Sequence, residues 1–309
     1  MDKLNAYLRL FRWPNLLLIV LTQTLLRYAV IHPGLSGKGL THTGFFMLVM
    51  ASVCVAAAGY AINDYYDIRI DRINKPGKMV LGNKLDRQDA LLPFFFLNAL
   101  ALGLSAWISL NISYWPLFFM FLVFVFAGWI YSLRYKGIFL AGNVLVALLS
   151  GFVPLVVWQA EMQAALAIAP VQPPSAGLAW EITLACALFA AMTSLLRELI
   201  KDMEDIKGDA RAGCRTIPVS LGMHFSSRLA LVWTSLLIAG VGYAQWLLAG
   251  KGMWVMPAYL LLAVQSVFIY LFLALAGLFP AAGPGRLQRA VKLAMAAGIL
   301  SIGLLFYYF

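Results

Sequence analysis

Residues 43–71 read TGFFMLVMASVCVAAAGYAINDYYDIRID, and this stretch decides the fold class of the chain. Its first twenty residues, 43–62, carry no charged side chain. A helix of about 20 apolar residues spans the hydrocarbon core of a bilayer, which is about 30 Å thick. The next nine residues, 63–71, hold three aspartates. The stretch therefore predicts a transmembrane helix whose end carries a cluster of carboxylates.

Similar apolar runs recur along the whole chain of 309 residues. They fall near residues 14–32, 43–62, 89–109, 115–133, 138–158, 178–200, 226–249, 254–278 and 288–308. Polar and basic connections are expected at 63–88, 134–137, 201–225 and 279–287, and a Pro-rich one at 159–177. We therefore expect an all-α, polytopic membrane protein, a bundle of nine transmembrane helices that forms a single domain over residues 1–309.

The composition excludes the common soluble classes. Hydrophobic residues make up 62% of the chain and charged residues only 12%, against about 25% charged in a typical soluble domain. This balance argues against a soluble enzyme, a disordered regulator and a secreted disulfide scaffold. The three cysteines, Cys54, Cys186 and Cys214, form no CxxC pair, so neither a zinc site nor a disulfide framework is expected.

The net charge of +10 is distributed unevenly between the two predicted sides of the membrane. If the N-terminus lies in the cytoplasm, 20 of the 23 Lys and Arg residues fall on the cytoplasmic side, and only Arg27, Lys38 and Lys251 lie outside. Basic loops prefer the cytoplasm. We therefore expect the basic loops and any active-site cavity to face the cytoplasm, the C-terminus to lie outside, and Arg27 to sit at the outer membrane interface. The charge then reflects topology and does not indicate a nucleic-acid partner.

The acidic residues are concentrated in two short segments. Of 13 acidic residues, eight lie in 63–71 and 197–209. Each segment contains three aspartates at spacing i, i+3, i+7, namely Asp64, Asp67 and Asp71 in the first and Asp202, Asp205 and Asp209 in the second. Corresponding aspartates are all 138 positions apart. Residues at this spacing share one face of a helix, so the sequence predicts two matched acidic faces at the ends of the second and sixth helices.

Three carboxylates on one face repel one another, and a cation would offset that repulsion. Carboxylate oxygens suit hard ions such as Mg²⁺, which retains waters and bridges to phosphate oxygens. Two such faces that meet would hold Mg²⁺ ions around a diphosphate. All six aspartates are therefore candidate metal-binding and catalytic residues. The alternative interpretation is that they only mark solvated helix ends.

Basic residues and turn residues flank both acidic segments. Arg72, Lys75 and Lys78 follow the first segment, and Lys207, Arg211 and Arg215 lie in or after the second. Arg and Lys can hold the oxygens of a diphosphate, although each of these residues can equally serve membrane topology alone. The segment Asn74-Lys75-Pro76-Gly77 and Gly208 are typical of turns in loops that close over a site.

These residues resemble known motifs. Asn63-Asp64-x-x-Asp67-x-x-x-Asp71 resembles the first Asp-rich motif of the UbiA superfamily of intramembrane prenyltransferases, and Asp202-x-x-Asp205-x-x-x-Asp209 resembles the second. Tyr131-x4-Lys136, Gly142-Asn143 and Arg12-Trp13-Pro14-Asn15 are similar to further elements of that superfamily. The resemblance implies nine helices, a Mg²⁺ cofactor, an isoprenyl diphosphate donor and a bacterial or archaeal-type plasma membrane. It implies that the substrate-binding residues are Asn15, Asn63, Arg72, Lys75, Lys78, Tyr131, Lys136 and Arg215.

Within the superfamily, several segments are most similar to the branch that prenylates geranylgeranylglyceryl phosphate for ether lipids. These segments are 58–65, 73–76, 197–202 and 213–218. Lys75-Pro76-Gly77-Lys78 departs from the commoner Arg-Pro ending of the first motif. The resemblance implies Mg²⁺-dependent transfer of a long isoprenyl group to this lipid-like acceptor, within a membrane of lipid.

The chemistry implied by the resemblance begins with loss of diphosphate from the donor, which leaves an allylic cation. Aromatic faces stabilise cations, and Tyr65, Tyr66 and Tyr131 are candidates for that role. Two alternatives stay open. An aromatic acceptor such as a hydroxybenzoate or naphthoate quinone precursor would use the same donor chemistry. A membrane transporter is the alternative of another class, although transporters place charges near the bilayer midplane, whereas both clusters here lie at one surface.

Overall fold

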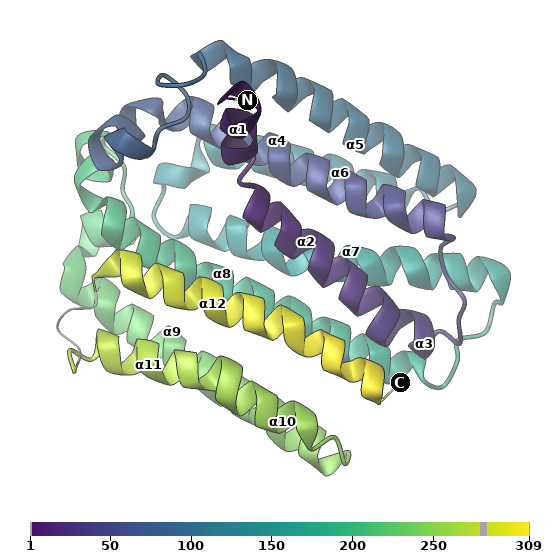
Figure 1. Ribbon diagram of the computed structural model, residues 1–309. Helices are drawn as coiled ribbons and strands as arrows, with labels where there is room; N and C mark the ends of the chain where they lie inside the picture. The colour runs from purple at the N-terminus through teal and green to yellow at the C-terminus, as the bar shows by residue number, and fades with distance from the viewer. Residues whose placement is uncertain (1, 279–282, 309) are drawn as a thin grey trace.

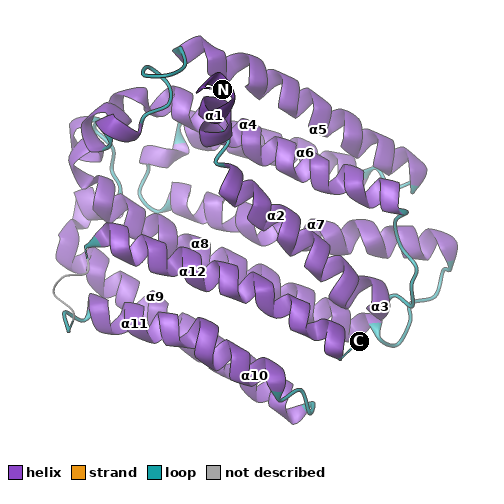
Figure 2. Ribbon diagram, viewed as in Figure 1, coloured by secondary structure: helices purple, strands orange, loops and turns teal. Residues whose placement is uncertain are grey.

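The computed structural model describes residues 2–278 and 283–308, and the side chains of Asp2 and Lys78 also lie outside the described part. Throughout these ranges the chain is built from helices, and no strand element is present (Figures 1 and 2). Nine helices of the described residues are long and apolar enough to cross a membrane. The prediction of an all-α, polytopic membrane protein is therefore confirmed.

The spans follow one another along the chain and are joined by short connections. They are α2–α3 (Trp13–Gly34), α4 (His42–Asn74), η3–α5 (Arg87–Asn111), α6 (Pro116–Leu133), α7 (Ala141–Ile168), α8 (Ala176–Arg211), α9 (Ile217–Gly250), α10–α11 (Val255–Leu275) and α12–η6 (Pro284–Tyr307). Short elements α1 (Asp2–Leu10), η2 (Pro76–Lys78) and η4 (Tyr135–Gly137) lie outside the spans.

Helices α4 and α8 extend well past the apolar runs that predicted them. They contain 33 and 36 residues, or about 50 Å of helix at about 1.5 Å per residue, against a hydrocarbon core of about 30 Å. The predicted connections were therefore wrong over 63–74, 201–211 and 217–225, and 159–168 likewise belongs to α7. Charged side chains do not stop a helix outside the hydrocarbon core, so both Asp motifs lie on helix.

Helix α8 occupies the middle of the bundle and packs against α4, α7, α9 and α12. Helix α4 packs in turn against α2, α5 and α6. One core cluster includes Leu48, Phe121 and Val157, and a second includes Leu196 and Phe268. Asn74 at the end of α4 is hydrogen-bonded to Asp205 and Gly208 near the end of α8, so the two acidic ends lie at the same end of the bundle. The prediction that the two motifs meet is therefore supported by the packing of these helices.

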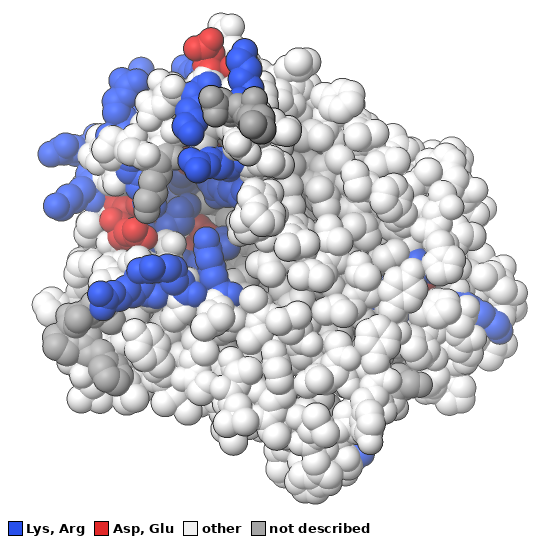
Figure 3. Space-filling view, viewed as in Figure 1, with Lys and Arg blue, Asp and Glu red and all other residues white. Residues whose placement is uncertain are grey.

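Lys and Arg gather at that same end of the molecule. In Figure 3 they crowd the left end of the visible face, around the connections that follow α4 and α8, and few appear at the right. We call the left end the charged end. The end of the last described helix, α12–η6, lies at the opposite end (Figure 1), as an odd number of spans requires. The one-sided charge distribution is thus present on the folded molecule.

Arg27 is buried inside the bundle, near the end opposite the charged end, and its expected position at the outer membrane interface stays a prediction. Its side chain is 1% exposed and its Nε is 3.1 Å from Oε1 of Glu161, which is fully buried. Its Nη2 donates to the carbonyl of Leu40, and the guanidinium lies 4.3 Å from the centre of the Phe45 ring. This pairing could not be predicted from local sequence, since the partner of Arg27 on α7 lies 134 residues away.

Candidate active site

A polar cavity of about 350 Å³ opens at the charged end, between the ends of α4 and α8. Five of the six motif aspartates line it, from both helices: Asp64, Asp67, Asp71, Asp205 and Asp209. Basic residues line it too, namely Arg9, Arg12, Lys75, Lys136, Arg197, Lys201 and Lys292. The i, i+3, i+7 spacing on two neighbouring helices thus brings carboxylates and cations together around one cavity, as the sequence predicted.

Most of the motif aspartates have a polar partner from another segment of the chain. Asp64 pairs with Arg12 at 2.7 Å, Asp205 with Lys75 at 2.7 Å and Asp67 with Lys136, while Asp202 accepts from Asn143 at 2.8 Å and Asp209 from Thr216 at 3.5 Å. Burial alone would lower the pKa of the Arg12 guanidinium, but the Asp64 carboxylate raises it above its ordinary value. Arg12 therefore carries its full charge at the cavity wall.

Asn74 joins the two Asp-bearing helices directly. Its Oδ1 accepts a hydrogen bond of 2.8 Å from the backbone N–H of Gly208, and its Nδ2 donates to the Asp205 carbonyl at 3.0 Å. A Cβ atom on Gly208 would lie 2.4 Å from the Asn74 amide. The expectation that Gly208 forms a turn was wrong, because it lies within α8 and its missing side chain admits Asn74.

A second glycine brings the segment between α6 and α7 close to the cavity. A Cβ on Gly142 would lie 2.7 Å from the Tyr135 carbonyl oxygen and 3.3 Å from the Tyr131 ring. This close approach places Lys136 against Asp67, and the next residue, Asn143, bonds to Asp202. The Tyr131–Lys136 segment therefore contributes one lysine to the acidic face of α4.

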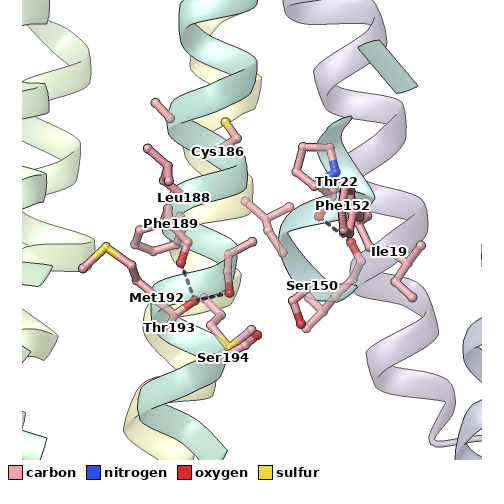
Figure 4. A pocket seen from close by; sticks show the side chains of 18 of the residues that line it. Ile19, Thr22, Ser150, Phe152, Cys186, Leu188, Phe189, Met192, Thr193 and Ser194 are labelled. Atoms are coloured by element: carbon pink, nitrogen blue, oxygen red, sulfur yellow. Dashed lines mark hydrogen bonds between the residues drawn. The ribbon is translucent and has the colours of Figure 1, made fainter. Parts of the chain in front are cut away.

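A larger, mainly apolar cavity of about 800 Å³ extends from the polar one into the bundle. Figure 4 shows part of its wall, where Ile19 and Phe152 face Leu188, Phe189 and Met192 of α8 across the space. The hydroxyl of Thr193 donates to the Phe189 carbonyl at 2.7 Å, so this polar group is satisfied within its own helix. The cavity therefore offers an apolar surface at the depth of the membrane.

The two cavities share six lining residues, and we call this set the junction. It consists of Arg12, Asn15, Arg197, Glu198, Lys201 and Lys292. Glu198 is 2.6 Å from the Arg197 guanidinium and 3.6 Å from the Lys201 ammonium group. Motifs do not indicate Lys292, because it lies on α12 in an otherwise ordinary basic stretch. The polar cavity and the apolar cavity thus meet at the charged junction.

The structure separates the predicted substrate-binding residues into two groups. Asn15, Asn63, Lys75, Tyr131 and Lys136 each line one or both cavities. Arg72 and Arg215 are exposed and line neither cavity, and the side chain of Lys78 lies outside the described part.

The aromatic residues nearest to the site also differ from those expected. Tyr65 and Tyr66 line neither cavity, and the Tyr65 ring instead lies under the guanidinium of Arg87 at 4.2 Å. Tyr60 lines the apolar cavity beside Tyr131. The Tyr60 ring is 4.9 Å from the Arg12 guanidinium, and its hydroxyl accepts from Asn15 at 3.3 Å. Tyr60 is thus the aromatic residue that sequence reasoning missed.

The donor atoms around the polar cavity suit a hard cation. They are the carboxylate oxygens of five motif aspartates. The buried Oδ1 of Asn63, which lines the adjoining apolar cavity, has no hydrogen-bond partner within the described part. Such oxygens are the ligands that Mg²⁺ prefers. Over residues 2–278 and 283–308, no three His, Cys, Asp or Glu side chains converge on one point. Lysines contact Asp67 and Asp205 instead, so binding of an ion requires these lysines to move.

Comparison with known proteins identifies the class. The sequence model of the UbiA prenyltransferase family matches residues 29–277. The chain therefore belongs to the UbiA prenyltransferase family, a family of enzymes that transfer prenyl groups. The match includes both Asp motifs and the Tyr131–Lys136 segment.

More particular similarities point to one kind of enzyme within that family. The chain is 30% identical to the digeranylgeranylglyceryl phosphate synthase of Methanopyrus kandleri, over 96% of this chain and 98% of the relative. Among solved structures, a digeranylgeranylglyceryl phosphate synthase superposes with a TM-score of 0.60 at 22% identity, over 98% of this chain and 99% of the other. A UbiA homologue from Archaeoglobus fulgidus bound to DMAPP and Mg²⁺ superposes with a TM-score of 0.58 at 16% identity, with the same coverage. These two superpositions confirm the fold.

Proposed function

We propose that this protein transfers a geranylgeranyl group from its diphosphate to geranylgeranylglyceryl phosphate, with Mg²⁺ as cofactor. The observation that carries the proposal is the junction, where a polar cavity lined by both Asp motifs opens into an apolar cavity of about 800 Å³. The Methanopyrus kandleri relative, which matches along nearly its whole length, is named for this product. The charged diphosphate of the donor would fit the polar cavity, and its long apolar tail would fit the apolar cavity that adjoins it.

The donor diphosphate would lie in the polar cavity. Asp67, Asp71, Asp205 and Asp209 would hold Mg²⁺ there, and the bound ion would neutralise charge that develops on the leaving diphosphate. Lys75 and Lys136, which now contact Asp205 and Asp67, are placed to turn towards the phosphate oxygens. Exchange of a carboxylate partner for a phosphate partner keeps each lysine paired, so the rearrangement leaves no unpaired charge.

The donor tail would pass the junction and lie in the apolar cavity, and the reactive C1 of the donor would lie near the junction. There the carbon–oxygen bond to diphosphate breaks and an allylic cation forms. Tyr60 and Tyr131 line the apolar cavity close to the junction, and their aromatic rings are suited to stabilise that cation. A hydroxyl oxygen of the acceptor then forms the new bond to C1, and its proton passes to the departed diphosphate. Low water content in the apolar cavity protects the cation from hydrolysis.

We further propose that the charged end faces the cytoplasm. The gathering of Lys and Arg at that end supports this orientation. In a background in which Cys54, Cys186 and Cys214 are replaced by Ser, Lys84→Cys at the charged end should react with an impermeant maleimide only after the cells are opened. A cysteine at Lys251, at the opposite end, should react in intact cells. The reverse pattern would contradict the orientation.

The function is tested by product analysis with the purified protein in lipid nanodiscs. Labelled geranylgeranyl diphosphate is supplied with geranylgeranylglyceryl phosphate, 4-hydroxybenzoate or dihydroxynaphthoate, each with Mg²⁺ or with EDTA. We expect a digeranylgeranylglyceryl phosphate product that requires Mg²⁺ and the first acceptor. Preferential prenylation of an aromatic acid would replace the proposed acceptor, and absence of product with every acceptor would contradict prenyl transfer itself.

A further inference from the structure

The junction carries an excess of positive charge that the donor site does not use. Of its six residues, four are cations and one is a carboxylate. Arg12 is neutralised by Asp64, and Glu198 is shared between Arg197 and Lys201. Lys292 has no ion-pair partner among the residues that the structure describes. These groups together leave an excess of two positive charges at the junction.

The remaining wall of the polar cavity has the opposite balance. Asp67, Asp71, Asp205 and Asp209 line it together with Arg9, Lys75 and Lys136, which leaves an excess of one negative charge. That balance suits Mg²⁺ with the donor diphosphate. The positive junction is set back from it, because Arg197 precedes Asp205 by eight residues, or about 12 Å along the axis of α8. The cavity therefore has an acidic outer part and a basic inner part.

The side chains of α12 on this wall are also short of partners. Gln288 lines the polar cavity, and its buried Nε2 has no hydrogen-bond acceptor in the described part of the chain. Gln288 and Lys292 are four residues apart and thus share a helix face. Close packing holds this helix against α8, since a Cβ on Gly298 would lie 2.4 Å from the ring of Phe189. A buried amide donor without an acceptor costs free energy unless a ligand satisfies it.

We propose that Lys292 and Gln288 of α12, together with Arg197 of α8, form a second anion site that binds the phosphate monoester of the acceptor. This inference rests on the proposed function and extends it to the place of the acceptor headgroup. A phosphate monoester carries a charge of about −1.5 to −2 at pH 7, which matches the excess charge of the junction. Its three terminal oxygens accept hydrogen bonds from ammonium, guanidinium and amide donors alike.

The site explains how two anionic substrates occupy one cavity without competing for the same cations. The donor diphosphate lies among the aspartates with its metal, and the acceptor phosphate lies at the junction. The acceptor tail enters the apolar cavity from there, and its glycerol hydroxyl lies between the two phosphate sites, beside the donor C1. Selection of a phosphorylated acceptor then depends on α12, a helix that carries neither Asp motif.

Direct binding tests this assignment without the need for turnover. The affinities of wild type and Lys292→Gln for geranylgeranylglyceryl phosphate, and separately for geranylgeranyl diphosphate with Mg²⁺, are measured by titration in nanodiscs. We expect acceptor binding to weaken at least roughly tenfold, as loss of one charge-assisted hydrogen bond predicts, with donor binding changed less than about twofold. Lys292→Arg keeps the charge and should bind the acceptor nearly as wild type does.

Two controls separate the site from general electrostatics. Arg289→Gln removes an exposed charge from the same helix at a residue that lines neither cavity, and it should leave both affinities unchanged. Geranylgeranylglycerol, which lacks the phosphate, should bind wild type and Lys292→Gln equally. Unchanged acceptor affinity in Lys292→Gln, a change confined to the donor, or no acceptor binding by wild type would each overturn the inference. Failure of the proposed function would instead appear as intact binding of both substrates without product.

Discussion

Ion pairs occur at both ends of the bundle, but they differ in what surrounds them. At the charged end, the Lys75–Asp205 pair lines a cavity, and its side chains are 26% and 12% exposed. At the opposite end, Arg27 and Glu161 are 1% and 0% exposed and line neither cavity. The first pair can exchange partners with a ligand, whereas the second is enclosed by protein on all sides.

This difference separates binding from stability. A pair beside a cavity holds charged groups ready and contributes little to stability while solvent screens it. An enclosed pair cannot be broken without leaving a buried charge. Arg27 belongs to the first span and Glu161 to α7, and Oε2 of Glu161 also accepts from the Leu40 backbone N–H at 2.9 Å. We therefore expect substitutions at the two ends to affect different measurements.

The largest effect should come from Glu161→Leu. It leaves the Arg27 guanidinium buried without its carboxylate, which typically costs about 3–5 kcal/mol. The melting temperature in detergent should fall sharply, while the KM for the donor of the protein that remains folded should not change. Arg27→Met combined with Glu161→Leu removes both charges and should recover most of the stability. Equal instability of the single and double variants would show that the pair is not the cause.

Asp67→Asn should have the reverse pattern. It removes a carboxylate from the acidic part of the polar cavity, and loss of one electrostatic contact to a reacting group typically lowers kcat by about 10²- to 10³-fold. The melting temperature should stay within about 2 °C of wild type, because Lys136 is partly exposed at the cavity and an Asn side chain can still accept from Asn63. Asp86→Asn is the matched control, since Asp86 is exposed, lines neither cavity and Asn preserves its helix cap. Wild-type turnover by Asp67→Asn would remove this residue from the site.

Gly208→Ala tests the contact that holds the two Asp motifs together. The added methyl group would collide with the Asn74 amide, and overpacking of this kind costs about 1–3 kcal/mol. Because the contact also positions Asp205, kcat should fall together with stability, so this variant should move both measurements. Gly103→Ala on α5 adds a methyl group with no atom within 4 Å and should leave kcat unchanged. A loss of stability without any loss of kcat would separate the contact from the site.

The sequence was sufficient for those features that depend on local pattern. The nine spans follow from apolar runs, and the shared face of Asp64, Asp67 and Asp71 follows from helical spacing. Helix ends were misplaced because charged residues such as Asp202 continue a helix beyond the hydrocarbon core. Hydropathy records where the membrane ends, and the helix continues until a residue such as Pro76 or Gly213 stops it.

Features that depend on packing between distant helices were not predictable in this way. The Arg27–Glu161 pair needs knowledge that the first span and α7 are neighbours. Lys292 joins the site only because α12 packs against α8. Arg72 shows the opposite error, since proximity to a motif in sequence does not place a side chain in the cavity. Charge and spacing locate the site, and helix packing decides which of the nearby residues belong to it.

The most direct test of the account is the binding of geranylgeranyl diphosphate to the purified protein with and without Mg²⁺. The measurement compares wild type with a variant that carries both Asp67→Asn and Asp205→Asn, one substitution in each motif. We predict that Mg²⁺ tightens binding to wild type by at least roughly tenfold and has no effect on the double variant. Equal binding by both proteins, or binding by wild type that is indifferent to Mg²⁺, would contradict the claim that the two Asp motifs form one metal-dependent diphosphate site.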